Sequence, residues 1–188
     1  MDFEKIINNI KYGLELIKKV DRIIERWEKI EGYDNYSVST FGKVRNDKTK
    51  KILKKLIDSS TGYYIVRLCK DGKAKTSRIH KLVAKAFFKN PQNKECVDHI
   101  DRNKLNNHFL NLRFATNSEN GMNRSKQKNN TSGYIGVVFD KKNNKYTAQY
   151  KLNGKMKHIG RYVTAEQASK AYQEKIKEHF KEFANLSE

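Results

Sequence analysis

Four side chains in residues 96–120 have types and spacings that could carry out chemistry. Asp98 and His99 are adjacent, and Asn111 and Asn120 follow them. Carboxylate and amide oxygens are the ligands that a hard divalent cation prefers. A histidine that titrates near neutral pH is a natural base for an attacking water, and an asparagine or backbone carbonyl can hold its second ring nitrogen. These residue types therefore suit the hydrolysis of a phosphodiester.

A strand, a polar loop, a second strand and a helix should position these side chains. We expect the strands over residues 94–98 and 109–116, with the sequence DRNKLNNH forming the loop. Thr116 and Glu119 have the spacing of a capping box, which predicts that a helix begins near Asn117. If this segment folds back on itself, Asn120 in the first helical turn faces the strand end at Asp98. The helix N-terminus would then add partial positive charge near a phosphate.

The charge of the chain indicates a polyanionic partner. The formal net charge is +19 over 188 residues, and residues 43–89 hold 15 basic residues against 3 acidic ones. Such an excess is typical of nucleic-acid binding, and the alternative is an ordinary solvated surface. The densest part of this excess is a basic ribbon suited to phosphate contacts that position the chain on DNA. Its members are Lys43, Arg45, Lys48, Lys50, Lys51, Lys54 and Lys55.

Cysteine and hydrophobic patterns weigh against several other classes. A zinc site is an alternative because Cys96 lies three residues before His99, with Cys69 and His80 upstream. Zinc ribbons normally use two close ligand pairs, however, and only one pair is close here. Two cysteines are too few for a disulfide scaffold and fit a reducing, cytoplasmic setting. No run approaches 18 apolar residues, and no secretory signal is recognisable at the N-terminus. We therefore expect an intracellular protein without a membrane partner.

The N-terminal segment is predicted to be one long amphipathic helix. Apolar residues recur at steps of three and four from Phe3 to Trp27. This stripe favours a helix packed on its own chain, with self-association as the alternative. We accordingly expect a monomer, and a homodimer through residues 3–26 is the alternative.

Short strands and turns should follow. Aromatic and β-branched residues alternate after Trp27, with a turn at Ser39–Gly42, and Asp71-Gly72 is a strong hairpin signal. Ser77 could cap a helix over RIHKLVAKAFF. His80 lies beside the apolar face of that helix, so a structural role is predicted for it.

The C-terminal part predicts a small sheet backed by a helix. After a polar linker at 125–131 come three strand-like segments, with a type I′ turn at Asn153-Gly154. Thr164 and Gln167 then form a capping box for the helix AEQASKAYQEKIKEHF. In the middle strand Thr147, Gln149 and Lys151 share one face, which is polar and could enter a major groove.

Residues 78–124 resemble the HNH (ββα-metal) nucleases, specifically the homing-endonuclease subgroup. The likeness rests on HKLVAKAF ahead of VDHID, NN, NL and a final Asn. The resemblance implies that Asp98 and Asn120 bind one Mg²⁺ or Mn²⁺, that His99 is the general base, and that Asn111 fixes the loop and His99. Asn120 stands where many members carry a third histidine, as in the H-N-N variety.

Two flanking stretches also resemble DNA-binding modules. WEKIEGYDNYSVSTFGKVRN is similar to the N-terminal NUMOD4 element of these endonucleases. Residues 132–181 resemble the AP2 DNA-binding domain through GYIGVVFD, YTAQY, HIGRY and AEQASKAY. This chain has Ile135 and Val138 where the AP2 family often has arginines, so base readout there should be weaker or shifted. The AP2 resemblance implies DNA contacts from Gln149, Lys151, Lys155, His158 and Arg161.

These inferences together predict an α+β protein that acts on double-stranded DNA. The expected function is a homing-type, metal-dependent endonuclease that nicks one strand per active site. The alternative is a non-catalytic DNA-binding regulator built on the same scaffold, and an RNA substrate is a weaker third choice. The predicted domains are an amphipathic helix (1–26), a NUMOD4-like module (27–57), the HNH core (58–124), a linker (125–131) and an AP2-like sheet with one helix (132–188).

Overall fold

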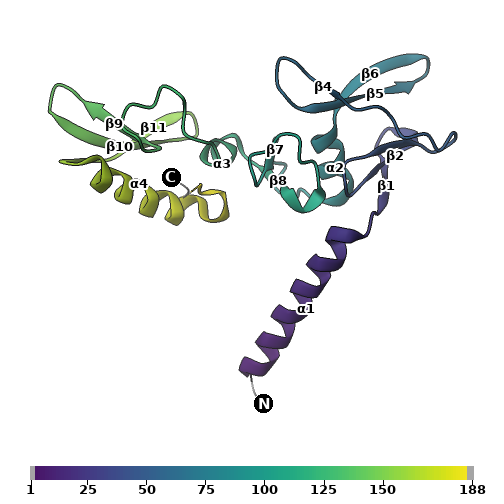
Figure 1. Cartoon of the computed structure of the whole chain (residues 1–188), viewed down its shortest axis with the longest axis horizontal. Coiled ribbons are helices and arrows are strands. Elements are labelled where there is room, and N and C mark those ends of the chain that lie inside the picture. The colour runs from purple at the N-terminus through teal and green to yellow at the C-terminus, as the bar shows by residue number, and fades with distance from the viewer. Residues whose placement is uncertain (1–2, 186–188) are drawn as a thin grey trace. The chain divides into compact units, whose positions relative to one another are not determined.

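The computed structural model describes residues 3–185, and Figure 1 labels most of their helices and strands. These residues form two compact units. The first takes the described residues up to Lys89 together with Lys104–Leu112, and the second takes Asn90–Asn103 together with those from Arg113 onward. Both helices and strands are present in each unit, which confirms the predicted α+β class.

The first unit contains two small antiparallel sheets and the helix α2. Its sheets have the strand orders β1-β2-β3 and β4-β5-β6, and α2 packs against strands of both. Val38, Val44, Leu68, Ile79 and Val83 are almost fully buried between these elements. The elements are α1 (Phe3–Ile23), β1 (Trp27–Ile30), β2 (Tyr33–Ser39), β3 (Val44–Asn46), β4 (Leu56–Ile57), β5 (Tyr64–Lys70), β6 (Lys73–Arg78), α2 (Ile79–Phe87) and the 3₁₀ turn η1 (Phe109–Asn111).

Turn chemistry in this unit follows the sequence closely. Asp71 and Gly72 both have positive φ and join β5 to β6, which confirms the predicted hairpin. Gly42 lies in the tight turn after β2, where its backbone N–H donates to the carbonyl of Ser39 at 2.9 Å. A Cβ at Gly42 would lie 2.8 Å from the Cβ of Asn107, so this close approach requires glycine.

The predicted cap of α2 is wrong. Ser77 lies in β6, where it pairs with Val66. The N-cap residue is Arg78, and it makes no side-chain cap hydrogen bond. The pairing with β5 thus extends the strand past the residue that could have capped the helix. His80 is buried in the first turn of α2, and its ring lies 4.5 Å from that of Tyr63 between centroids, with an interplanar angle of 48°.

The N-terminal helix is shorter and more exposed than its stripe predicts. α1 ends at Ile23, and Trp27 opens β1 instead of extending the helix. Leu14, Ile17 and Ile23 are between 52% and 76% exposed, so this apolar face does not pack on the described chain. The expectation of an intrachain partner for α1 is therefore wrong for these side chains. None of the described helices combines the length and apolar character needed to cross a membrane.

The second unit combines a β-hairpin-like pair, a short helix and a three-stranded sheet covered by α4. The sheet order is β11-β10-β9, and α4 packs on all three strands. This confirms the predicted three-stranded antiparallel sheet backed by one helix. The elements are β7 (Cys96–His99), β8 (Leu112–Ala115), α3 (Asn117–Met122), β9 (Val137–Asp140), β10 (Lys145–Leu152), β11 (Lys155–Tyr162), α4 (Ala165–Phe180) and the 3₁₀ turn η2 (Lys181–Phe183).

A single apolar cluster holds this unit together. Ala148 and Tyr150 of β10 pack with Tyr172, Ile176 and Phe180 of α4. The cluster also includes Ala115 of β8 and Met122 of α3, so the β7–β8–α3 segment and the sheet share one core. The core of the sheet therefore also supports the segment that carries Asp98 and His99.

Local signals for this unit are largely confirmed. Both predicted capping boxes are present, with Thr116 and Glu119 at α3 and Thr164 and Gln167 at α4. The turn at Asn153-Gly154 joins β10 to β11 with positive φ at both residues. Two strands of the site differ in their bounds. The first three residues of the predicted strand over 109–116 form η1, so β8 begins at Leu112. The strand predicted over 94–98 is β7, which runs from Cys96 to His99.

Candidate active site

Asp98 and His99 lie at the end of β7, which pairs with β8. Each residue is 5% exposed, so both are held inside the fold rather than on a surface loop. The chain turns immediately afterwards, where the backbone N–H of Arg102 donates to the carbonyl of His99 at 2.8 Å. Arg102 has a φ of 65°, in the left-handed region, which completes this tight turn.

The carboxylate of Asp98 has partners on both oxygens. Arg113 of β8 donates to Oδ2 from Nε at 2.9 Å, and its Nη2 lies 2.8 Å from the same oxygen. Asn123 donates from Nδ2 to both Oδ1 and Oδ2 at 3.0 Å, and to the carbonyl of His99 at 2.8 Å. A buried carboxylate requires such partners to remain charged. Asp98 therefore enters the site with its rotation fixed.

Asn123 is a site residue that sequence reasoning missed. It lies at the C-cap of α3, one helical turn after Asn120, so both residues project from the same side of the helix. The side chain of Asn120 is exposed and makes no hydrogen bond within residues 3–185. The spacing of three residues is the signal that could have found Asn123, because residues three apart lie on the same face of a helix.

The N-terminus of α3 is fixed by charge as well as by its capping box. Glu119 accepts from the backbone N–H of Thr116 at 2.7 Å, and Lys94 Nζ lies 2.9 Å from its other carboxylate oxygen. Burial alone would raise the pKa of Glu119, but the Thr116 N–H and Lys94 outweigh it and lower the pKa. The helix carrying Asn120 and Asn123 is thus anchored at its start by an ionised side chain.

Asn111 belongs to the first compact unit, where it ends η1. Its Nδ2 donates to the carbonyl of Asn106 at 2.9 Å, and its backbone N–H donates to the carbonyl of His108 at 2.9 Å. These two bonds close the loop over residues 106–111. A loop-fixing role was expected for Asn111, and these contacts are compatible with it.

The oxygen atoms that Asp98 and Asn120 offer fit a hard divalent cation by their chemistry. Asp98 Oδ1 carries no Arg113 contact, and the exposed amide of Asn120 offers a carbonyl oxygen. Hard cations such as Mg²⁺ use carboxylate and carbonyl oxygens and retain several waters. Within the described residues no three His, Cys, Asp or Glu side chains gather into a metal-binding group. The thiols of Cys69 and Cys96 are both free.

Four members of the basic ribbon, for which we expect DNA contacts, fall into two groups. Lys43 Nζ lies 2.9 Å from Glu25, and the guanidinium of Arg45 lies 4.2 Å from the ring centre of Trp27. Lys50 and Lys51 are exposed at the turn after β3. The first pair is therefore held by side-chain partners, and the second pair projects into solvent.

Asp47 organises the neighbourhood of Arg45. Its carboxylate accepts from Lys29 Nζ at 2.8 Å, from Ser37 Oγ at 2.7 Å and from Arg45 Nε at 3.1 Å. Burial would by itself raise the pKa of Asp47, but the hydrogen bonds from these three side chains outweigh it and lower the pKa to about 2. The ionised carboxylate consequently fixes the orientation of Arg45.

The sheet of the second unit separates its predicted DNA contacts by face. Gln149 pairs with His158 across β10 and β11, while Lys155 pairs with Leu152. Because paired residues share a face and Leu152 packs against the core, Lys155 lies on the side covered by α4. Gln149, His158 and Lys151 lie on the opposite, uncovered face.

Arg161 also lies on that uncovered face, where it has an acidic partner. It pairs with Thr147 across the sheet, and its Nε lies 3.5 Å from Asp140. A β-bulge between Ala148 and Gln149 shifts the register, which sets His158 rather than Ile159 opposite Gln149. The uncovered face thus presents amide, imidazole, ammonium and guanidinium groups together.

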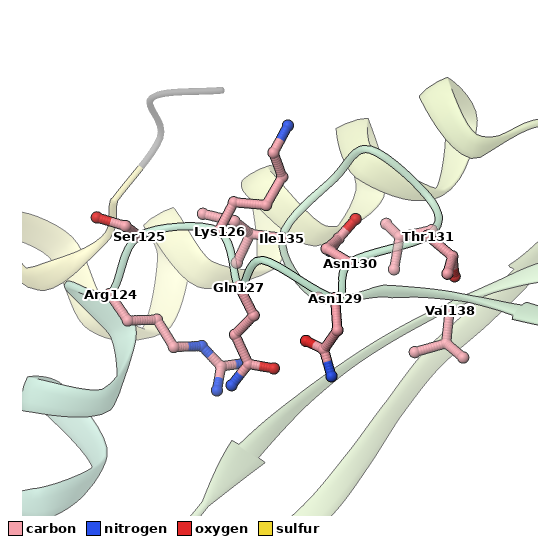
Figure 2. Close-up of a pocket in the computed structure, with 11 residues that line it drawn as sticks. Arg124, Ser125, Lys126, Gln127, Asn129, Asn130, Thr131, Ile135 and Val138 are labelled. Atoms are coloured by element: carbon pink, nitrogen blue, oxygen red, sulfur yellow. The ribbon is translucent and has the colours of Figure 1, made fainter.

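Residues 124–131 are folded against the start of this sheet rather than extended. Asn130 Nδ2 donates to the carbonyl of Tyr134 at 2.8 Å, and Lys126 Nζ donates to the carbonyl of Gly133 at 2.9 Å. All of residues 124–131 except Lys128 line a pocket of about 230 Å³ together with residues 135–138. Figure 2 shows Arg124, Gln127 and Asn129 pointing to the same side of this loop.

Two family models match this chain. Residues 25–69 match the NUMOD4 motif, and residues 78–122 match the HNH endonuclease family. The second match contains Asp98, His99, Asn111 and Asn120. The chain thus contains a segment that matches the HNH endonuclease family, preceded by a segment that matches the NUMOD4 motif.

Named relatives include endonucleases of viruses and phages. An uncharacterized HNH endonuclease of Acanthamoeba polyphaga mimivirus is 39% identical over 70% of this chain and 36% of its own length. The DNA endonuclease I-HmuI of Bacillus phage SP01 is 43% identical over 52% of this chain and 58% of its own length. The H-N-H endonuclease F-TflII of Escherichia phage T5 is 31% identical over 58% of each protein. The chain thus spans about a third to three fifths of these relatives.

A solved structure also matches part of the chain. It is titled "DNA binding and cleavage by the HNH homing endonuclease I-HmuI" and has a TM-score of 0.49 with 41% identity. The match covers 52% of this chain and 56% of that one.

Proposed function

We propose that the chain is a homing-type HNH DNA endonuclease that hydrolyses a phosphodiester with one divalent metal ion. The observation that carries this proposal is the buried Asp98–His99 pair, whose carboxylate is fixed by Arg113 and Asn123 inside the segment that matches the HNH family. The names of I-HmuI and F-TflII support the same activity.

The chain's own residues would divide the work as follows. A bound Mg²⁺ or Mn²⁺ would stabilise the charge on the phosphate and on the leaving oxygen. Asp98 and the carbonyl of Asn120 are the ligands that would hold this cation. His99 would accept the proton of the attacking water as general base. Asn111 would fix the loop over residues 106–111. One such site per chain cuts one strand, so the expected product is a nick.

The basic and polar surfaces would hold double-stranded DNA. In the first unit Lys50 and Lys51 are free to contact phosphates, with Lys43 and Arg45 held ready by carboxylates. In the second unit we propose the uncovered face of the AP2-like sheet, with Gln149, Lys151, His158 and Arg161. Lys155 would contact DNA only from the edge, because it lies on the other face. We also propose an intracellular location, where a homing-type endonuclease would meet its DNA substrate.

The test is nicking of supercoiled plasmid by the full-length protein. With Mg²⁺ or Mn²⁺ the parental protein should convert the plasmid to its open-circular form, and EDTA should prevent this. His99→Ala should abolish nicking and retain salt-sensitive DNA binding, while His179→Ala, which removes an exposed histidine on α4, should nick normally. Nicking by His99→Ala at the parental rate would contradict the assigned base. DNA binding without metal-dependent nicking by the parental protein would favour the regulator.

The oligomeric state is a further part of the proposal. The exposed apolar face of α1 favours self-association over a monomer. Residues 1–30 hold 7 basic and 6 acidic residues, so two copies could meet there without the repulsion expected elsewhere in a chain of net charge +19. Sedimentation of the full-length protein and of Leu14→Glu with Ile17→Glu should give a dimer and a monomer respectively. A monomer in both would refute this.

A further inference from the structure

Arg113 connects the carboxylate of Asp98 to the C-terminal end of the described chain. Its Nε and Nη2 both contact Asp98 Oδ2, at 2.9 Å and 2.8 Å, while Nη1 donates to the backbone carbonyl of Glu182. The guanidinium also lies 4.0 Å from the ring centre of Phe183. Its side chain is only 16% exposed. All three nitrogens of the guanidinium are therefore engaged by two segments that lie far apart in sequence.

Phe183 is itself held firmly. It is 6% exposed and belongs to the apolar cluster of α4 and the sheet. Lys94 Nζ lies 5.0 Å from the centre of the same ring, so two cations contact this one aromatic side chain. Two residues after Phe183, Asn185 donates from Nδ2 to the carbonyl of Arg124 at 2.8 Å. The turn η2 thus cannot move without disturbing the core of the unit.

The geometry at Asp98 gives this connection a chemical consequence. Both Arg113 contacts go to Oδ2, which leaves Oδ1 with Asn123 Nδ2 as its hydrogen-bond donor among the described residues. A guanidinium is planar and its donors form a rigid fork, so its position sets the rotation of the carboxylate. The direction in which Oδ1 faces therefore depends on where Arg113 is held.

We propose that Arg113 is a positioning residue for Asp98, and that Phe183 and the Glu182 carbonyl hold it in place. The C-terminal end of the second unit thereby sets the affinity of Asp98 for its metal ion. This inference rests on the proposed function only where it takes Asp98 as a metal ligand. Partners that orient a metal ligand typically change metal affinity or activity by about 10-fold or more when removed.

The principal test compares Phe183→Leu with Phe180→Leu in the full-length protein. Both phenylalanines are 6% exposed in the same apolar cluster, but Phe180 contacts Tyr150 rather than Arg113. The first readout is the hydrogen-exchange rate of the Arg113 Nε–H in the metal-free protein, measured by NMR. We expect faster exchange in Phe183→Leu and the parental rate in Phe180→Leu, because only the first removes the aromatic face beneath the guanidinium.

The second readout is Mn²⁺ binding, followed by the electron paramagnetic resonance of the free ion. Phe183→Leu should require about 10-fold more Mn²⁺ for half-saturation and for half-maximal nicking, with DNA binding unchanged. Arg113→Lys should behave similarly, since it retains the charge but loses the fork. Phe180→Leu should match the parental protein.

The outcomes separate this inference from the proposed function. Equal exchange rates and equal Mn²⁺ affinities in the two leucine variants would overturn the inference. If Phe183→Leu does not fold, Arg113→Lys provides the test, because Arg113 lies outside the apolar cluster and its substitution should leave the core intact. A Mn²⁺ affinity of Arg113→Lys equal to that of the parental protein would then overturn the inference. If the parental protein neither binds Mn²⁺ nor nicks DNA, the proposed function fails. The exchange rates still decide whether Phe183 holds Arg113.

Discussion

Two asparagines on one short helix should respond in opposite ways to the same substitution. Asn123 donates to the charged carboxylate of Asp98 and to the carbonyl of His99, whereas the side chain of Asn120 is exposed. A hydrogen bond to a charged group contributes about 1.5–3 kcal/mol. Because Asp98 keeps both contacts from Arg113, we expect Asn123→Ala to lower the free energy of unfolding by about 2 kcal/mol.

This loss should be visible as a fall in the melting temperature. About 2 kcal/mol corresponds to about 8–16 °C in a domain of 60–100 residues. Asn120→Ala should change the stability by less than about 0.5 kcal/mol, because it is a surface substitution. In nicking assays Asn120→Ala should nevertheless lose metal-dependent activity, since it removes a proposed ligand.

The measurement is thermal unfolding by circular dichroism at pH 7 in EDTA, so that metal binding does not contribute. The parental protein and both variants should be compared at equal concentration. Equal melting temperatures for Asn123→Ala and the parental protein would refute the structural role of Asn123. An equally large fall in Asn120→Ala would refute the view that its side chain is free to bind metal.

Two further predictions concern parts of the chain outside the site. Because the pKa of Asp47 is lowered from 3.8 to about 2, its contribution should be complete above about pH 4 and lost as the pH falls towards 2. Asp47→Asn should therefore lower stability by about 1 kcal/mol at pH 7, after allowance for solvent screening, and by less near pH 3. Melting curves of the parental protein and of Asp47→Asn from pH 3 to 7 test this. A difference in melting temperature between the two proteins that grows towards low pH would contradict it. Gly136→Ala should destabilise by more than about 2 kcal/mol, because φ is +75° and its Cβ would lie 2.0 Å from the Tyr172 ring. Gly133→Ala is the control, because Gly133 also has a positive φ but its added Cβ would meet no atom within 4 Å. If urea unfolds Gly133→Ala at a midpoint as low as that of Gly136→Ala, the clash with Tyr172 is not the cause of the destabilisation.

Signals that depend on a few neighbouring residues were predicted well. The capping box of Thr116 and Glu119, and the hairpin turn at Asn153-Gly154, are both present where the sequence indicates them. Each requires only backbone groups within about four residues, so the local chain contains all the information. The side of the sheet on which Lys155 lies could also have been derived from the sequence, because a two-residue turn pairs Lys155 with Leu152.

Structural features that depend on a residue distant in sequence were predicted poorly. Ser77 has the right type for a helix cap, but its pairing with Val66 in β5 outweighs that local preference. The stripe of α1 predicts a packed helix, yet no segment of the described chain covers Leu14 or Ile17. A hydrophobic pattern identifies a face to be buried without naming its partner.

The same distinction between local and distant information applies to the candidate site. The sequence by itself determined the residue types at Asp98, His99 and Asn120, since the chemistry of carboxylate, imidazole and amide does not depend on the fold. Only the tertiary structure decided that Arg113 and Asn123 hold the Asp98 carboxylate. Hydrogen bonds depend on distances below about 3.5 Å and on direction, and these are fixed by the packing of β7, β8 and α3 on a shared core rather than by spacing along the chain.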